Sequence, residues 1–277
     1  MKPLYILKIG GSVATYKNKL GVSVRKELLE KSAIAIKKAR DKKDFNLILI
    51  HGAGAAGHQL AHKYNLQDGA RNNKQKWKGS FESRLVNQEL NKRITEIFVF
   101  AGLPITPIHT ASVIIQKNKK IFDFNLKTIE ESLRWGCIPL LYGEMVFDKN
   151  LGMTICSGDV IAPYLAKKMK AKKIFFASDI EGIFDKDPHL HKDAKLIENI
   201  QMTDIKKIAQ LTGSHNIDTT GGLNGKIKNF QKFNVSDSIE IFNGLRSENF
   251  EKVILENYFP HTKLFLKRKT TRRSSSS

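Results

Sequence analysis

Two glycine-rich segments are the parts of this 277-residue chain best suited to do chemistry. Residues 10–12 (Gly-Gly-Ser) follow the apolar run 4–9, which carries Lys8, and residues 51–58 follow the apolar run 45–50. Backbone amides between a strand and a helix can bind an anion, and glycine lets a ligand approach without meeting a Cβ atom. A single such turn is equally compatible with an ordinary connection. Two of them facing each other would suit a phosphoryl donor and a phosphoryl acceptor, although neither fits the P-loop or dinucleotide-binding pattern.

Three later segments carry further groups of this kind. Residues 157–159 (Ser-Gly-Asp) precede a helical pattern, and the run 175–185 ends in an acidic turn that contains Asp179. Residues 219–226 add glycines and Lys226 before another helical pattern. The serine or the aspartate of 157–159 could serve only as a helix cap. The acidic turn lies where nucleotides bind at the carboxyl edge of a parallel sheet.

Apolar runs of strand length alternate with helical patterns, which predicts an α/β fold with a mainly parallel sheet covered on both faces. A core-facing helix is expected over 81–101, preceded by a polar segment, 65–80, that forms a mobile loop or a helix near a site. Two hairpins are expected, over 113–123 and 146–155, and a hairpin beside a cleft can form a lid. The expected strands are 4–9, 45–50, 105–108, 138–142, 173–177 and 239–242.

Composition restricts the class of protein. The formal charge is +20, but the lysines are spread between apolar positions over many helical faces, so nucleic acid is an unlikely partner. The segment 267–273 is the exception, because it is dense in lysine and arginine. With the four serines after it, it lacks apolar residues, and we expect a disordered tail. No signal peptide and no apolar stretch near the roughly 18 residues that cross a bilayer are found, which predicts a cytoplasmic protein without a membrane partner. Cys137 and Cys156 are expected to be buried, inert thiols.

Taken together and in order, these motifs resemble the amino acid kinase superfamily over residues 1 to about 258. Within it, Lys17, the pair Gly57 and His58, and the segment 140–144 look most like the isopentenyl phosphate kinases. The resemblance implies an open αβα sandwich that works as a homodimer and moves the γ-phosphoryl of magnesium ATP onto isopentenyl phosphate. It implies an acceptor-binding half over about 1–150 and a nucleotide-binding half over about 151–260. The residues after these, 261–277, are expected to form the basic, serine-rich tail.

The resemblance also assigns roles to residues. Lys8 and Lys17 would hold the transferring phosphoryl group, with Lys17 stabilising the transition state, His58 would donate to the acceptor phosphate, and Asp159 would orient the lysines. These four are the expected catalytic residues. An alkyl monophosphate is mostly ionised at neutral pH, so its oxygen needs charge compensation rather than a general base. The expected ATP-binding residues are Lys8, Gly10, Gly11, Ser12, Gly54, Asp179, Gly222 and Lys226, and the expected substrate-binding residues are Ala53, Gly54, Gly57, His58 and Gly158.

Other polar residues are given structural interpretations. His51 ends a buried strand and is expected to be a satisfied core histidine. His58 and His62 have the spacing of a metal pair, but with no third ligand nearby we expect no metal site formed by protein side chains. The second turn also departs from the family, which more often has a glycine at position 53 and an aromatic residue at position 56. The methyl of Ala53 would crowd the acceptor phosphate, and Ala56 would change the apolar end of the pocket.

Two other functions are compatible with the sequence. One is a kinase of the same fold acting on another small phosphate, phosphonate or carboxylate, as a fosfomycin kinase or an acetylglutamate-type kinase would. His58 favours a phosphate or phosphonate acceptor over a carboxylate. The other is a basic nucleic-acid-binding or regulatory protein on a degenerate kinase fold, against which Lys8, Lys17, Asp159 and Lys226 all argue.

Overall fold

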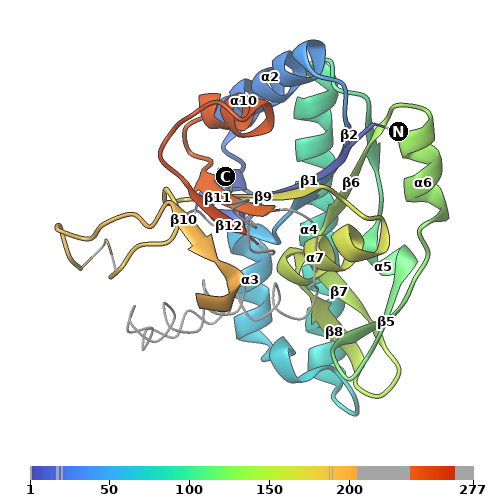
Figure 1. Ribbon diagram of the computed structural model, residues 1–277. Helices are drawn as coiled ribbons and strands as arrows, with labels where there is room; N and C mark the ends of the chain where they lie inside the picture. Colours follow the sequence, from blue (N-terminus) through green and yellow to red (C-terminus); the bar gives the residue numbers. More distant parts are fainter. Residues whose placement is uncertain are drawn as a thin grey trace, which may run out of the picture.

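A large, mainly parallel β-sheet forms the centre of the protein in the computed structural model (Figure 1). The structure describes residues 2–16, 19, 21–186, 188, 190–204 and 238–265. The strand order is β10-β12-β11-β9-β1-β2-β6-β3, and within this sheet only the pairing of β11 with β12 is antiparallel. The strands are β1 (Leu4–Ile9), β2 (Asn46–His51), β3 (Ile105–Pro107), β6 (Ile138–Tyr142), β9 (Lys173–Ser178), β10 (Asn199–Gln201), β11 (Ser238–Asn243) and β12 (Thr262–Phe265).

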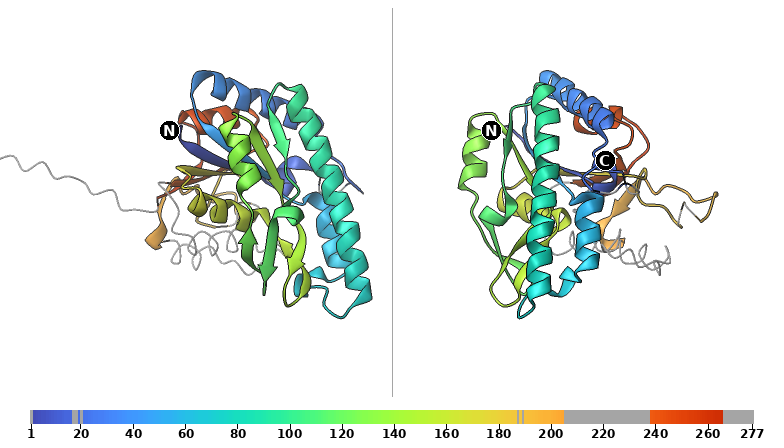
Figure 2. Two further views of the ribbon diagram at one scale, coloured as in Figure 1. Left: turned by 90° about the vertical axis from the view of Figure 1, so that its right-hand side faces the viewer. Right: turned by 180° about the vertical axis from the view of Figure 1, so that it is seen from behind.

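Helices cover both faces of this sheet and make three layers (Figure 2). Successive residues of β1 alternate between two apolar cores, with Leu7 in one and Ile6 in the other. The first core contains α2 (Lys26–Lys42), α4 (Lys74–Phe100) and α10 (Glu248–Leu255), and the second contains α6 (Lys127–Arg134) and α7 (Gly158–Lys168). Because both faces are buried, the central strands are almost continuously apolar. The αβα sandwich predicted from the sequence is confirmed.

The two predicted hairpins are present and pair into one smaller sheet, of order β5-β4-β7-β8. This sheet packs against α4 through β7. Its strands are β4 (Ile114–Lys117), β5 (Lys120–Phe124), β7 (Glu144–Asp148) and β8 (Gly152–Cys156). The other elements of the described residues are short: α1 (Gly11–Ala14), α3 (Gly54–Lys63), η1 (Leu66–Asp68), α5 (Thr110–Val113) and η2 (Met202–Asp204).

Two boundaries differ from the expectation. The tail was expected from residue 261, but Thr262–Phe265 forms β12 inside the main sheet, where Leu264 is fully buried. Buried and half-buried residues alternate in this strand. The expectation was wrong because an alternation over only four residues is too short to be recognised in the sequence. The helix expected from residue 81 begins at Lys74, so the second half of the polar segment 65–80 is its first turns. Within the described residues, no helix is both long and apolar enough to cross a membrane.

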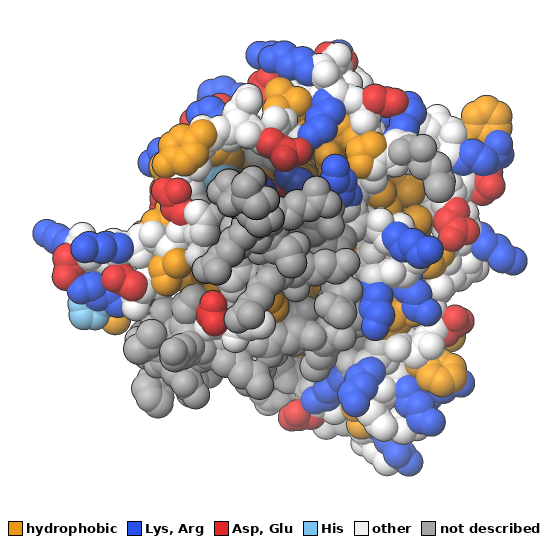
Figure 3. Space-filling view, in the orientation of Figure 1, with side chains coloured by type: hydrophobic (Ala, Val, Ile, Leu, Met, Phe, Trp, Pro, Cys, Tyr) orange, Lys and Arg blue, Asp and Glu red, His pale blue; other side chains and the backbone are white. Residues whose placement is uncertain are grey.

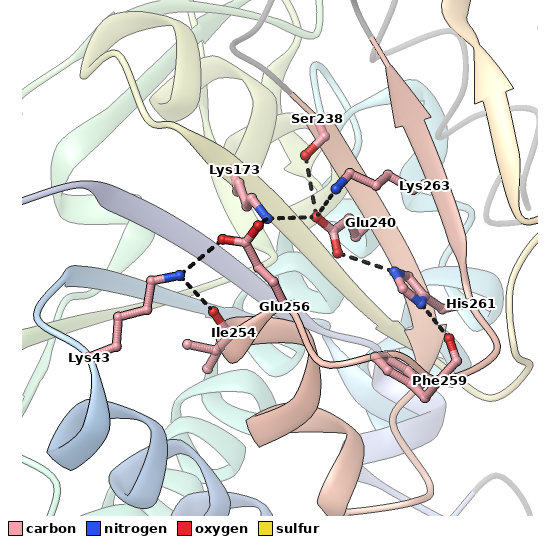
Figure 4. A network of polar contacts seen from close by, with 9 residues as sticks. All are labelled: Lys43, Lys173, Ser238, Glu240, Ile254, Glu256, Phe259, His261 and Lys263. Atoms are coloured by element: carbon pink, nitrogen blue, oxygen red, sulfur yellow. Dashed lines mark hydrogen bonds and ion pairs between the residues drawn. The ribbon is translucent and has the colours of Figure 1, made fainter.

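A network of charged side chains lies at the amino ends of β9 and β11 (Figure 4). The Nζ atom of Lys173 lies 3.1 Å from a carboxylate oxygen of Glu240 and 3.1 Å from one of Glu256. Lys43, which follows α2, lies 3.0 Å from the other oxygen of Glu256. His261 contacts Glu240 at 3.2 Å. The network therefore connects the ends of α2 and α10 to the sheet.

This network predicts a pH dependence of stability. Burial acts to raise the pKa of the Glu256 carboxyl, but the hydrogen bonds from Lys43 and Lys173 outweigh it and lower the pKa to about 2, from 4.5. The folded state therefore favours the carboxylate, and this contribution is complete above pH 4.5 and lost as the pH falls towards 2. We expect Glu256→Gln to lower the melting temperature at pH 6, and the difference from the wild type to disappear near pH 2.5. Thermal unfolding across this range, with Glu130→Gln on the exposed face of α6 as control, measures it; a difference that stays constant with pH would contradict the assignment.

Candidate active site

A cleft of about 560 Å³ opens at the carboxyl ends of β1, β2 and β9. Every expected site residue within the described ranges lines it. Lys17, Gly222 and Lys226 lie outside the described residues. The residues that the structure brings together are Lys8, Gly10, Gly11, Ser12, Ala53, Gly54, Gly57, His58, Gly158, Asp159 and Asp179.

The two glycine-rich turns pack directly on each other. A Cβ atom on Gly52 would lie 2.9 Å from the backbone nitrogen of Gly11, and one on Gly11 would lie 3.1 Å from that of Gly54. Thr15 joins the turns, since its hydroxyl donates to the carbonyl of Gly11 at 2.8 Å and accepts from the amide of Ala55 at 3.1 Å. Glycine is needed here because backbone meets backbone. The facing arrangement expected of a phosphoryl donor and acceptor is thus present.

Two helices begin at the cleft. The first residue of α3 is Gly54 and that of α7 is Gly158, and both line the cleft. Ser157 caps α7, accepting at Oγ from the amide of Asp159 at 3.2 Å. The amino end of a helix presents free N–H groups and a partial positive charge. Anionic groups bound in this cleft would therefore be stabilised from two directions.

Lys8 and Asp159 form an ion pair in the floor of the cleft. The Nζ atom of Lys8 lies 2.9 Å from Oδ1 of Asp159, and the two side chains are 8% and 18% exposed. Lys8 is the next-to-last residue of the buried strand β1, and Asp159 lies in the first turn of α7, so both are held by rigid elements. The carboxylate fixes the direction of the ammonium group, which carries three donors. Asp159 is thus more than the helix cap that the sequence alone also allowed.

His51 is a core residue, as expected. It is fully buried, and burial lowers the pKa of its imidazole to about 4. In this neutral ring Nδ1 donates to the carbonyl of Gly52 at 2.8 Å and Nε2 accepts from Asn91 at 3.2 Å. The ring also stacks on Tyr142 with centroids 5.2 Å apart. His51 therefore supports the second glycine turn from beneath.

Cys156 is buried and burial raises the pKa of its thiol to about 12, which agrees with the inert role expected for it. Cys137 is only half-buried, so that part of the expectation is wrong. Ala53 lines the cleft as expected. Ala56 is buried, and the lining of the cleft comes from its neighbours in α3 instead. Among the residues that the structure describes, no group of three or more metal-ligating side chains is found.

Sequence reasoning missed part of the lining of the cleft. Ser83 and Asn87 of α4, Met145 of β7 and Ile155 of β8 line it. Glu144 lines it too; its side chain is fully buried, and burial raises the pKa of the carboxyl. The spacing of Ser83 and Asn87, four residues apart in a helix expected to face the core, was the available signal.

Comparison with known proteins places these features in a family. The model of the amino acid kinase family matches residues 3–242. The isopentenyl phosphate kinase of Methanocaldococcus jannaschii is 35% identical over 91% of this chain and 95% of its own length, and that of Methanothermobacter thermautotrophicus is 27% identical with the same coverage. A solved structure of an isopentenyl phosphate kinase covers 94% of this chain and 99% of its own with a TM-score of 0.80 at 24% identity, which supports the fold. The chain belongs to the amino acid kinase family, and within it to the isopentenyl phosphate kinases.

Proposed function

We propose that this protein transfers the γ-phosphoryl group of ATP to isopentenyl phosphate and so makes isopentenyl diphosphate for isoprenoid biosynthesis. The names of the relatives support this reaction. The observation that carries it is the pair of glycine turns packed against each other above the ion pair of Lys8 and Asp159. Such a cleft has room for two phosphate-bearing ligands and donors directed at both.

On the acceptor side, we assign the phosphate to the amino end of α3, with contacts from Ala53, Gly54, Gly57, His58 and Gly158. The acceptor phosphate is already largely ionised at neutral pH, its second pKa being about 6, so no general base is needed. What the site must supply is compensation of negative charge, because two anions approach each other and the transition state spreads charge over the transferring group. His58 stands at the exposed rim of the cleft, where it can donate to an entering phosphate.

On the donor side, we assign ATP to Lys8, Gly10, Gly11, Ser12, Gly54 and Asp179, and by resemblance to Gly222 and Lys226. Lys17 is assigned the stabilisation of the transition state, also by resemblance. Asp159 orients Lys8 through their ion pair. We also propose an acceptor half over about 1–150 and a nucleotide half over about 151–260, with residues 8–12 and Gly54 of the acceptor half contacting the phosphates of ATP.

Magnesium is the expected companion of ATP. The ion is commonly bound by one or two carboxylates together with phosphate oxygens and water. Asp159 and Asp179 line the cleft and fit this requirement. When bound, the ion would neutralise charge on the phosphates; the residues of the chain hold and orient them.

The test is a steady-state assay of the purified protein with ATP and magnesium. The acceptors are isopentenyl, dimethylallyl and geranyl phosphates and fosfomycin, with ADP release as the readout and phosphorus NMR to identify the diphosphate. We expect turnover of isopentenyl phosphate, abolished by chelation of magnesium. The absence of turnover with every prenyl phosphate would overturn the proposal, and turnover of fosfomycin alone would establish the rival acceptor.

We also propose that the protein acts as a homodimer in the cytoplasm. Large apolar side chains on α4 are exposed, among them Leu85 at 67% and Phe100 at 88%, and these suit contact with a second chain. The basic side chains on the face shown in Figure 3 are interspersed with acidic and apolar ones. This distribution does not favour a nucleic acid as the partner. Both substrates are phosphates that do not cross membranes, which agrees with a cytoplasmic reaction. Sedimentation of the wild type and of Leu85→Lys measures the association.

A further inference from the structure

One peptide unit of the second glycine turn has its orientation set from beneath the cleft. The carbonyl of Gly52 accepts a hydrogen bond of 2.8 Å from Nδ1 of His51, whose side chain is fully buried. This carbonyl therefore points into the core. The peptide bond between Gly52 and Ala53 is trans, so the N–H of Ala53 points in the opposite direction. Gly52 and Ala53 both line the cleft, so the N–H is directed at the space that a ligand would fill.

The amide of Ala53 is available to such a ligand. Ala53 directly precedes α3, so its N–H has no carbonyl of that helix as a partner. The amide of Gly52 donates to the carbonyl of Ile9 at 3.0 Å, and that of Ala55 donates to the hydroxyl of Thr15 at 3.1 Å. Among the described residues, no such acceptor is found for the amide of Ala53. A bound anion would supply one.

Asn91 of α4 fixes the proton of His51 on the nitrogen that faces the turn. Its side chain is 3% exposed, and its amide nitrogen lies 3.2 Å from Nε2 of His51. An amide nitrogen only donates, so Nε2 accepts and the proton of the neutral ring lies on Nδ1. Burial lowers the pKa of His51 to about 4, which keeps the ring neutral near pH 7. Asn91 therefore acts on the carbonyl of Gly52 through the imidazole.

Further contacts hold the ring of His51 in place. It stacks on Tyr142, with the centroids 5.2 Å apart and an angle of 7° between the planes. His51 and Tyr142 are register partners in the parallel pairing of β2 with β6. The carbonyl of His51 accepts from the amide of Gly143 at 3.0 Å. The donor to Gly52 is thus preorganised by packing and by a second layer of hydrogen bonds.

We propose that His51 and Asn91 are positioning residues that direct the amide of Ala53 at the acceptor phosphate. The proposal rests on the proposed function, in which this phosphate lies at the amino end of α3. Neither His51 nor Asn91 lines the cleft, so their effect passes through the backbone of the turn. It falls on the binding of the acceptor and not on that of ATP, and neither residue exchanges a proton with the substrates.

Substitutions at positions 51 and 91 test the proposal. His51→Leu leaves the carbonyl of Gly52 without its donor, and we expect the KM for isopentenyl phosphate to rise by about 10- to 100-fold. The KM for ATP should stay within about twofold of the wild type, and kcat should change less than the acceptor KM. His51→Asn places an amide nitrogen near the position of Nδ1 and should restore the acceptor KM to within about fivefold of the wild type. Asn91→Leu, which keeps the ring, should raise it by about 3- to 10-fold.

His261 provides the matched control. Its Nδ1 donates to the carbonyl of Phe259 at 2.8 Å, and its ring stacks on Phe259 with the centroids 4.4 Å apart. It belongs to the network of Figure 4 and does not line the cleft. His261→Leu removes the same kind of hydrogen bond and should lower the melting temperature while leaving both KM values unchanged.

The amide of Ala53 can also be followed directly by proton–nitrogen correlation NMR. Inorganic phosphate added to the wild type without ATP should shift the signals of Ala53, Gly54 and Gly57. In His51→Leu the shift at Ala53 should be lost at the same phosphate concentrations. This readout does not depend on turnover, and a general loss of stability would not remove the response of one amide alone.

The outcomes separate the positioning from the function. Unchanged KM values in a folded His51→Leu, or an equal rise of both KM values, would overturn the positioning and leave the proposed function standing. A wild type in which the signals of Gly54 and Gly57 move but that of Ala53 does not would do the same. Turnover of no prenyl phosphate, by a protein whose Ala53 signal responds to phosphate, would overturn the function instead. If His51→Leu does not fold, the acceptor KM of Asn91→Leu decides.

Discussion

Lys8→Met should lower kcat by about 10²- to 10³-fold, the loss typical of removing one preorganised charged donor from a transition state. Methionine keeps the length and the apolar stem of the side chain, so the core below the cleft stays filled. The ammonium group is lost, and with it the partner 2.9 Å from Asp159. Steady-state assays with saturating ATP and isopentenyl phosphate measure the effect, which should fall mainly on kcat.

A second lysine provides a control that separates an effect on catalysis from an effect on stability. Lys43 is also held in an ion pair, with Glu256 at 3.0 Å, but in the network at the opposite edge of the sheet. Lys43→Met should lower the melting temperature and leave kcat close to that of the wild type. If Lys8→Met kept kcat within threefold of the wild type, Lys8 would have no role in the transfer.

Gly54→Ala should reduce both stability and turnover. Gly54 has φ +68°, and a Cβ atom there would lie 2.8 Å from Cγ2 of Thr15 and 3.0 Å from Cδ2 of Leu90. A left-handed backbone costs a residue with a Cβ about 1–2 kcal/mol, and overpacking adds about 1–3 kcal/mol. The side chain would also push Thr15 away from the two turns that it joins. We expect a loss of about 3 kcal/mol in the free energy of unfolding and a fall in kcat of at least tenfold.

Gly21 provides the matched control, because its φ is +69° and an added Cβ atom would meet nothing within 4 Å. Gly21→Ala should therefore show the backbone cost alone, about 1–2 kcal/mol. Denaturant unfolding of both variants, with kcat measured beside it, separates backbone strain from crowding. Equal losses of unfolding free energy in the two variants would show that the atoms around Gly54 move away from the added Cβ atom without a cost in stability.

The strands and the glycine-rich turns of the cleft could be predicted because their sequence signals are local. The run 4–9 and the glycines after it follow from residue type and spacing, and a parallel sheet brings its carboxyl ends to one edge. The role of His51 could be predicted for the same reason, since a histidine that ends a buried strand needs partners close by. These features depend on neighbours in the sequence.

The rest depends on contacts between distant segments. Whether Ser83 and Asn87 face the core or the cleft is set by how α4 packs on the β7–β8 hairpin, about 60 residues further along the chain. Strand β12 is only four residues long and lies between β10 and β11, with which it pairs. Its formation therefore depends on these two neighbouring strands rather than on its own sequence pattern. Lys17, Gly222 and Lys226 remain predictions.

The hydroxyl of Thr15 has a consequence for how the reaction can be organised. It bonds at once to the first glycine turn, through Gly11, and to the second, through Ala55. The two turns therefore cannot separate without breaking that link. A single side chain of the protein thus restrains the separation of the two turns. If the two turns hold the donor and acceptor phosphates as proposed, the same two hydrogen bonds restrain how far apart those phosphates stand.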